Sequence, residues 1–552
     1  MKKQQFWWRS ENYIFALFVV LTAIPVLSSK FFPTVDGPAH LHNGNLLRQL
    51  WFCHQPIARD FFDINTHLNS NFIDHVWFAL AGIFLPSYLV EKSILLFYIV
   101  TLPYSFRFLA KRLVSDQQSA RIASYLIFSF VYSFTFQIGF FNFSIGIPLV
   151  FWTLGLWIQY RKRLTAKRLA WLCFLTTVIY VSHIFNFLLL GIVIGVNELQ
   201  YFIHFKTFSS ISKKLLALIV IFVPGLILST LFFISNNAFR HDPPSYLSKH
   251  DLIHTIIEFK PVITLSYDRE KNFALVIGLS VCALLVLAVI DYLKKRKAAH
   301  TQETQHTHGT PINQSTNESI NQGFQPLWIV STLIVLVLFF IFPDWVVSGG
   351  FISIRWALFF FYMLLIVITA KGLPVKQLLL PVATMLITHL FFLNYHTQQT
   401  KALSADAEML VEAEKHINNN SVLLPLNFST NWMQINFASY MATQKNIINL
   451  DNYEATKPHF PLMWKRGESV YGLMPGYGNK NPPCINIDAY EQTTHHRIDY
   501  VSRFYFNGDL KDSCSANIQN VLSANFDLIY ESKNKMLQLY KRKATSGIQA
   551  VN

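Results

Sequence analysis

Long apolar segments recur along the first 394 residues, and they constrain the fold more than any other feature of the chain. A helix needs roughly 20 consecutive apolar residues to cross about 30 Å of hydrocarbon, where every backbone polar group must be satisfied within the segment. The composition agrees, because 52% of the 552 residues are hydrophobic and only 14% are charged. The sequence therefore predicts a polytopic α-helical membrane protein and excludes a conventional soluble enzyme.

Basic residues between the apolar segments indicate the topology. Lys and Arg are retained in cytoplasmic loops, which places the clusters at 161–168, 206–214, 294–297 and 371–376 inside. The N-terminus is then inside and the C-terminus outside, which an even number of crossings cannot connect. We therefore predict roughly eleven to thirteen transmembrane helices. The twelve candidate segments are 13–28, 74–89, 92–109, 121–138, 143–160, 168–182, 184–203, 215–235, 273–292, 326–343, 355–370 and 376–394, of which 74–89 and 168–182 are the least suited to crossing.

The chain is strongly basic, with 46 Lys and Arg against 31 Asp and Glu and a net charge of +15. In a nucleic-acid-binding protein such an excess gathers on one soluble surface beside aromatic stacking residues. Here the basic residues flank apolar spans, so membrane topology accounts for them. We expect membrane lipids, and no nucleic acid, as partners.

Three segments outside the spans define the domain organisation. Residues 1–394 are predicted to form the transmembrane domain, and residues 395–552 a separate soluble domain long enough for its own core. Residues 30–72 follow a first helix that starts inside, so they are expected to form an extracytoplasmic loop. Residues 298–325 are polar and poor in apolar side chains, which predicts a disordered cytoplasmic linker. The C-terminal domain is then extracytoplasmic.

The C-terminal residues alternate between helical and strand-like patterns. Helices are expected over 405–417 and 434–443, and a third over SANIQNVLSA. This alternation predicts a small mixed α/β domain. The strand-like runs are SVLLPL, NIINL, IDYVSRFYF, FDLIYES and KMLQLYKR.

Cysteine usage separates two residues from the rest. Cys484 and Cys514 are the only cysteines of the C-terminal domain, and an oxidising compartment would permit a disulfide between them. The chain has no CxxC pair, no Cys/His zinc spacing and no phosphate-binding glycine motif, so no metal centre and no nucleotide site is predicted.

The segment PTVDGPAHLHNGNLLRQL, directly after the first span, carries the most chemistry. Asp36 followed by Pro38 is a typical helix start, and the leucines after it form an amphipathic face expected to lie along the membrane surface. Asp36 is then either an N-cap or a general base that accepts a proton from a hydroxyl, with His40 and His42 holding a phosphate. Asp60 and Asp63 are second-carboxylate candidates or ordinary loop acids.

Three motifs together resemble the GT-C membrane glycosyltransferases, which use polyprenyl-phosphate sugars. They are DGPAH, GFFNFSIGIPLVFW and YVSHIFNF, and the resemblance in layout spans residues 10–394. In that family an acidic motif opens the first extracytoplasmic loop, and Asp36 stands at the matching place. The family often has two adjacent acids there. This chain has one, which leaves a divalent cation open and no cofactor certain.

Three further residues fit the same resemblance. Arg355, at the start of an apolar helix, would bind the lipid-linked phosphate through its planar guanidinium, or else anchor the helix at the interface. His183 lies between two apolar runs and would face the same cavity, or else pack as a core histidine. Asn142 would contact substrate or cap a helix end.

The resemblance implies an enzyme of the bacterial inner membrane that transfers a sugar from a polyprenyl-phosphate donor. The acceptor would be an extracytoplasmic glycan, lipid or protein. Two other classes stay open from the residues alone, a transporter or flippase and a non-catalytic membrane scaffold. A transporter would show repeated halves with broken helices, and no internal repeat is visible.

Overall fold

A computed structural model describes most of the chain, which divides into two compact units, each built from two separate stretches. Unit 1 comprises Met1–Pro25 and Leu96–His396, and unit 2 comprises Val26–Leu95 and Thr397–Asn552. Residues 30–72 and the residues after 396, which the sequence predicts as separate pieces, therefore belong to one unit. The described residues are 2–53, 56–66, 70–204, 208–235, 243–305, 325–346, 349–465, 469–470, 485–506, 508 and 513–544.

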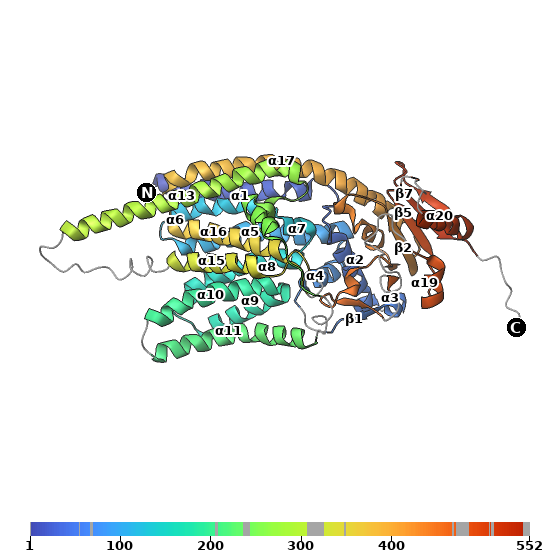
Figure 1. The fold of residues 1–552 in the computed structure, drawn as a ribbon, viewed down its shortest axis with the longest axis horizontal. Coiled ribbons are helices and arrows are strands. Elements are labelled where there is room, and N and C mark those ends of the chain that lie inside the picture. The colour runs from blue at the N-terminus through green and yellow to red at the C-terminus, as the bar shows by residue number, and fades with distance from the viewer. Residues whose placement is uncertain are drawn as a thin grey trace. The chain divides into compact units, whose positions relative to one another are not determined.

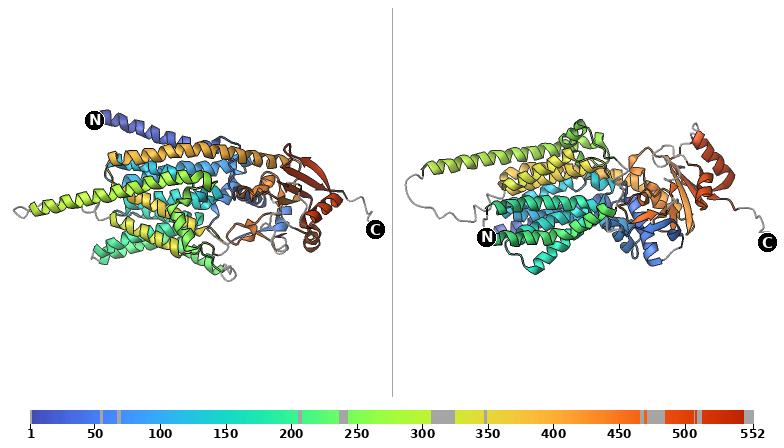
Figure 2. Two further views of the ribbon diagram at one scale, coloured as in Figure 1. Left: turned by 45° about the horizontal axis from the view of Figure 1, so that its top comes forward. Right: turned by 60° about the horizontal axis from the view of Figure 1, so that its bottom comes forward.

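Unit 1 is helical, and its long helices lie side by side (Figures 1 and 2). Three helices include residues of both units: α1 (Lys2–Leu27), α5 (Ser87–Leu113) and α17 (Val375–Glu414). The remaining elements are α6 (Gln117–Ala123), η2 (Ser124–Phe130), α7 (Phe134–Ile138), α8 (Phe141–Tyr160), α9 (Ala166–Ser182), α10 (Ile184–His204), α11 (Phe208–Ser235), α12 (Lys249–Ile257), η4 (Lys260–Val262), α13 (Tyr267–Gln305), α15 (Gln325–Ile341) and α16 (Ile352–Lys371).

Within the described residues, seven helices are long and apolar enough to cross a membrane: α1, α5, α8, α11, α13, α16 and α17. Two shorter apolar helices lie at Ile184–Leu199 and Pro326–Ile341. These helices identify an integral, polytopic membrane protein. The expected number of spans, eleven to thirteen, is not reached by helices of full length, because several predicted segments are short or interrupted.

Two predicted spans are not single helices. Segment 74–89 contains α4 (Ile73–Ala81), which has only 9 residues and belongs to unit 2. Segment 121–138 is divided among α6, the 3-10 helix η2 and α7. About 9 residues of helix cover some 14 Å, half of the hydrocarbon thickness. Segment 74–89 is therefore not a span.

The predicted linker over 298–325 also differs at its start. Helix α13 continues to Gln305, because the Lys, Ala, Gln and Glu residues that follow its apolar part have good helix propensity. Residues 306–324 lie outside the described residues.

Unit 2 is built around a five-stranded sheet with strand order β3-β2-β5-β7-β6. Strands β3 and β5 pair parallel to β2, whereas β7 and β6 add antiparallel. Strand β2 is buried along nearly its whole length, as a central parallel strand should be. The strands are β2 (Ser421–Asn427), β3 (Ile447–Asn449), β5 (Tyr500–Phe504), β6 (Phe526–Glu531) and β7 (Leu537–Arg542).

The strand predictions are confirmed, including the strand SVLLPL, which contains Pro425. The pairing of β2 with β3 ends at Leu423. The N–H that Pro425 lacks would point to the side where β3 has already ended, so no hydrogen bond of the sheet is lost. The predicted helix over 434–443 is instead two short 3-10 helices, η5 (Trp432–Gln434) and η6 (Phe437–Ala442). The predicted helix 405–417 is the end of α17.

Helices α2 (Gly37–Arg48) and α20 (Ser513–Asn525) of unit 2 share one hydrophobic cluster with Val422 and Leu424 of β2 and Val501 of β5, so both pack on the same face of this sheet. The remaining elements are η1 (Gln49–Cys53), α3 (Pro56–Phe61), η7 (Glu454–Thr456) and α19 (Ile487–Thr494), with a two-stranded sheet that pairs β1 (Phe62–Ile64) with β4 (Leu462–Trp464).

Helix α2 does not lie along a surface as expected. Every residue from Gly37 to Leu47 is buried, and Leu46 and Leu47 share a hydrophobic cluster with Val422 and Leu424 of β2. The amphipathic pattern predicts one apolar face against the membrane surface. The polar face of α2 is instead covered by side chains of the C-terminal stretch, which a sequence pattern cannot show.

Candidate functional site

Four ionisable side chains of unit 2 meet in its interior: His40, Asp74, His75 and Glu454. Nδ1 of His40 lies 3.0 Å from Oε1 of Glu454, and Nε2 of His75 lies 3.0 Å from Oε2. Nδ1 of His75 donates a hydrogen bond to Oδ1 of Asp74 at 2.6 Å. All four side chains are at most 4% exposed. We call these four residues the histidine–carboxylate cluster.

The close approach of α2 and α4 brings the two histidines together. A Cβ atom at Gly44 would lie 2.4 Å from Cβ of Phe78, so only glycine allows this crossing. One helical turn earlier on each helix, Nδ1 of His40 and Nε2 of His75 are 3.3 Å apart. Glu454 enters from η7.

Asparagines and an aromatic ring surround the cluster. Nδ2 of Asn43 donates to Oε2 of Glu454 at 2.5 Å, and Nδ2 of Asn452 donates to Oδ1 of Asn43 at 2.6 Å. The ring of Phe460 lies 5.5 Å from that of His75 and 5.8 Å from that of His40. The cluster is thus a hydrogen-bonded network closed off from water.

The electrostatics of the cluster follow from burial and from its two carboxylates. Burial by itself lowers the pKa of His40, but Glu454 and Asp74 outweigh it and raise that pKa to about 10. The same balance raises the pKa of His75, with Asp74 as the main opposing charge. Burial would raise the pKa of Glu454, but the two histidines hold it well below its ordinary value.

Asp36 occupies the N-cap position of α2, as expected, but its side chain makes no capping hydrogen bond. The hydroxyl oxygen of Thr34 accepts the N–H of Gly37 instead, at 3.0 Å. Oδ1 of Asp36 accepts a hydrogen bond of 2.9 Å from Nδ2 of Asn436. The carboxylate is only partly buried, so it is oriented by Asn436 and still reachable from solvent.

The other predicted residues of the first loop divide into buried and exposed. Nε2 of His42 lies 3.3 Å from the carbonyl oxygen of Ile447, and burial lowers the pKa of His42 to about 4. His40 and His42 are therefore interior residues, and their expected role in holding a substrate phosphate stays a prediction. Asp60 and Asp63 are exposed.

Arg355, His183 and Asn142 come together in unit 1, where aromatic rings surround the guanidinium. Its Cζ atom lies 4.2 Å from the ring centre of Phe140, 5.8 Å from Phe143 and 5.9 Å from Phe185. Arg355 is 9% exposed, so it is a buried cation–π site. We call these three phenylalanines and Arg355 the aromatic cage.

His183 packs against this cage, and Asn142 directly precedes Phe143 in α8. The His183 ring stacks on Phe185 at 5.5 Å and meets Phe143 edge-on at 5.3 Å, while its Nδ1 accepts the N–H of Phe185. The backbone oxygen of Asn142 accepts the hydroxyl of Ser182. Asn142 does not cap α8, because Phe140 occupies that position.

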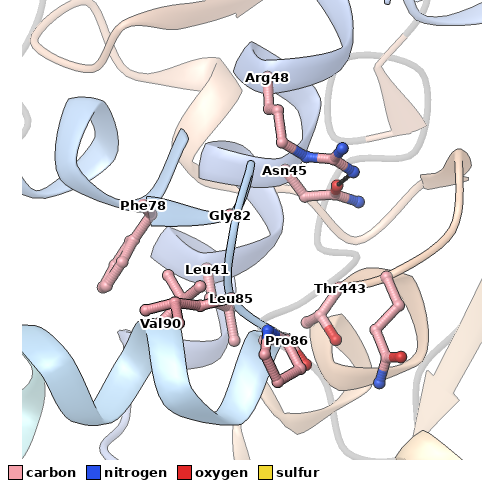
Figure 3. A pocket seen from close by; sticks show the side chains of 11 residues that line it. Leu41, Asn45, Arg48, Phe78, Gly82, Leu85, Pro86, Val90 and Thr443 are labelled. Carbon is pink, nitrogen blue, oxygen red and sulfur yellow. Dashed lines mark hydrogen bonds between the residues drawn. The ribbon is translucent and has the colours of Figure 1, made fainter. Parts of the chain in front are cut away.

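A cavity of about 170 Å³ also lies in unit 2, on a different face of α2 from His40 (Figure 3). At 100° per residue, Leu41, Asn45 and Arg48 point away from the face that carries His40 and Asn43. Nη2 of Arg48 donates to Oδ1 of Asn45 at 2.7 Å. The cavity is lined by Leu41, Asn45, Arg48, Phe78, Gly82, Leu85, Pro86, Ser87, Val90, Thr443 and Gln444.

Sequence reasoning missed Asp74, His75 and Glu454. A signal for the first two was present, because an Asp–His pair inside an otherwise apolar segment is costly in lipid and marks a functional or buried polar site. Glu454 lies in DNYEATKP, where nothing local distinguishes it. Cys484 and the side chain of Cys514 lie outside the described residues, so their disulfide stays a prediction.

No protein-family model matches this chain, and no curated protein is detectably similar to it.

Proposed function

We propose that this integral membrane protein is a glycosyltransferase that moves a sugar from a polyprenyl-phosphate donor to an extracytoplasmic acceptor. The hydrogen bonding of the Asp36 side chain is the observation that carries the proposal. A carboxylate needed only as an N-cap would bond to the first amides of α2, and this one does not. It is instead oriented by a side chain from the C-terminal stretch.

In the proposed reaction Asp36 is the general base. It accepts the proton of an acceptor hydroxyl as the hydroxyl oxygen forms a bond to the anomeric carbon of the sugar. The bond between that carbon and the phosphate oxygen breaks, and the polyprenyl phosphate leaves with the electron pair. Asn436 is a positioning residue, because its amide donates a hydrogen bond to one oxygen of Asp36.

Arg355 is assigned to the donor phosphate. Its guanidinium is always charged and has five N–H donors in a fork that matches phosphate oxygens. The guanidinium carbon of Arg355 lies over the ring of Phe140 at 4.2 Å, whereas hydrogen bonds to phosphate use the N–H groups at the edge of the guanidinium. Cation–π contact and phosphate binding are therefore compatible.

The proposal places the protein in the bacterial inner membrane with its C-terminal residues outside, where a glycan, lipid or protein would be the acceptor. The positive-inside distribution of Lys and Arg supports this orientation.

Asp36→Asn tests the proposal in a membrane transfer assay with polyprenyl-phosphate sugars. The amide keeps an oxygen that accepts from Asn436 but takes no proton, so transfer should fall by about 10²- to 10⁴-fold with normal expression and thermal stability. Asp60→Asn and Asp63→Asn are matched controls at exposed positions, and they should transfer at the wild-type rate. Wild-type transfer by a folded Asp36→Asn protein would exclude Asp36 as the base and favour a non-catalytic scaffold.

A further inference from the structure

We propose that His40, His75 and Glu454 form a buried site for a divalent transition metal of the zinc class, with Asp74 orienting one ligand. This metal site does not depend on glycosyl transfer. The sequence alone predicts no metal centre.

The donor atoms already have the spacing of a coordination sphere. Nδ1 of His40, Nε2 of His75 and a carboxylate oxygen of Glu454 all lie within 4.8 Å of one another, and the closest pairs are separated by 3.0 to 3.3 Å. Ligands about 2.05 Å from a tetrahedral ion are roughly 3.3 Å apart. Small shifts of the side chains would therefore complete three ligand positions.

The proposed ligands have the same types of hydrogen-bond partner as the ligands in known metal sites. The ring nitrogen of His75 that faces away from the site, Nδ1, donates to Asp74. Such a carboxylate–histidine–metal arrangement fixes the tautomer and makes the ligating nitrogen more basic. Asn43 orients the carboxylate of Glu454 by donating to its Oε2 atom. Two imidazoles and one carboxylate select zinc-class ions over Mg²⁺ and Ca²⁺, which prefer oxygen ligands.

Charge balance supports the same conclusion. The two carboxylates of the cluster, Asp74 and Glu454, offset the charge of a divalent ion held by two neutral imidazoles. No additional uncompensated charge is then buried, which would otherwise be costly.

Burial indicates a structural role for the metal. Asp74, His75 and Glu454 have no exposed side-chain area, and the ligands come from α2, α4 and η7. An ion held there would join three segments of unit 2 that are far apart in sequence. Closed structural sites contribute directly to folding free energy.

The test uses the full chain, purified in detergent without chelators or a histidine tag. We expect elemental analysis to find about one zinc-class ion per chain. Co²⁺ added to protein stripped with chelator should give the visible absorption of a four- or five-coordinate site. Asp74→Asn should keep the fold and weaken Co²⁺ binding about 10- to 100-fold. Asp63→Asn, an exposed acid of the same unit, is the matched control and should bind normally.

A double variant, His40→Leu with Glu454→Met, removes two of the three proposed ligands together and should abolish binding. Less than about one ion per ten chains in the wild type, together with no Co²⁺ absorption, would overturn the proposal. Full metal content in the double variant would also overturn it. If the double variant does not fold, the wild-type stoichiometry and the Asp74→Asn affinity still decide. None of these measurements requires transferase activity.

Discussion

The two polar sites of this protein bury charge in opposite ways. The histidine–carboxylate cluster of unit 2 balances imidazoles against carboxylates at 2.6 to 3.0 Å. The aromatic cage of unit 1 surrounds one guanidinium with ring faces at 4.2 to 5.9 Å. Removing one member of a balanced set leaves a charge behind, whereas removing a caged charge leaves only rings. The cluster should therefore be intolerant of neutral substitutions that the cage accepts.

Glu454→Gln should show the largest effect, because it leaves two buried histidines against one carboxylate. Breaking a buried charge pair from one side costs about 3–5 kcal/mol. We expect a matching drop in the thermal stability of unit 2 and faster hydrogen–deuterium exchange in α2 and α4. Glu531→Gln, on the exposed edge strand β6, should change stability by less than about 0.5 kcal/mol. Equal effects of the two substitutions would refute the charge-balance account.

Gly44→Ala tests whether the helix crossing holds the cluster together. The new methyl group would lie 2.4 Å from Cβ of Phe78, so α2 and α4 must separate at a cost of about 1–3 kcal/mol. Hydrogen exchange in α2 and α4 should increase. Gly195→Ala, where a methyl group would meet no atom within 4 Å, should leave stability unchanged or slightly higher. An unchanged α2 in the Gly44→Ala protein would show that the crossing is not essential.

Arg355→Met should have the smallest effect on folding, within about 1 kcal/mol, because lost cation–π attraction is offset by relief from burying a charge. Arg107→Met is the matched control in unit 1. Its guanidinium pairs with both oxygens of Glu11 at 2.7 and 2.5 Å, so its loss should cost about 3–5 kcal/mol. Thermal unfolding of both variants gives the comparison. If Arg355→Met were as damaging as Arg107→Met, the rings would not be what stabilises Arg355.

The affinity for the polyprenyl-phosphate donor distinguishes a functional role of Arg355 from a role in folding. Arg355→Lys keeps the charge but loses the planar fork, so a phosphate-binding role predicts weaker donor affinity in both Arg355→Lys and Arg355→Met. Unchanged donor affinity and turnover in both variants would leave Arg355 with a purely structural role.

The sequence predicts those parts of the fold that depend on local pattern. The apolar spans, the strands of SVLLPL and NIINL, and the final hairpin follow from runs of a few residues. The pairing of Phe62–Ile64 with Leu462–Trp464 has no such local signal. Nothing near Phe62 indicates a partner 400 residues away, so the joint unit could not be predicted from one sequence.

The same limit applies to the cluster. Asp36, His40 and His42 were identifiable because ionisable residues gather in one short segment. Their roles were not, because burial of α2 depends on side chains from the C-terminal stretch. In segment 74–89 the apolar majority outweighed Asp74 and His75, although a buried ion-paired helix explains that composition as well as a membrane span does.

The assembly of unit 2 from two distant stretches has a consequence for synthesis. Nε2 of His75 meets a carboxylate that the ribosome adds 379 residues later, which at about 5–20 residues per second is a wait of roughly 20–75 s. Until then α2 and α4 lack the C-terminal residues that neutralise their histidines and cover their apolar side chains. A nascent chain of this protein therefore has an unfinished first module that only its last third completes, and a prematurely terminated chain would expose that module to proteases and chaperones.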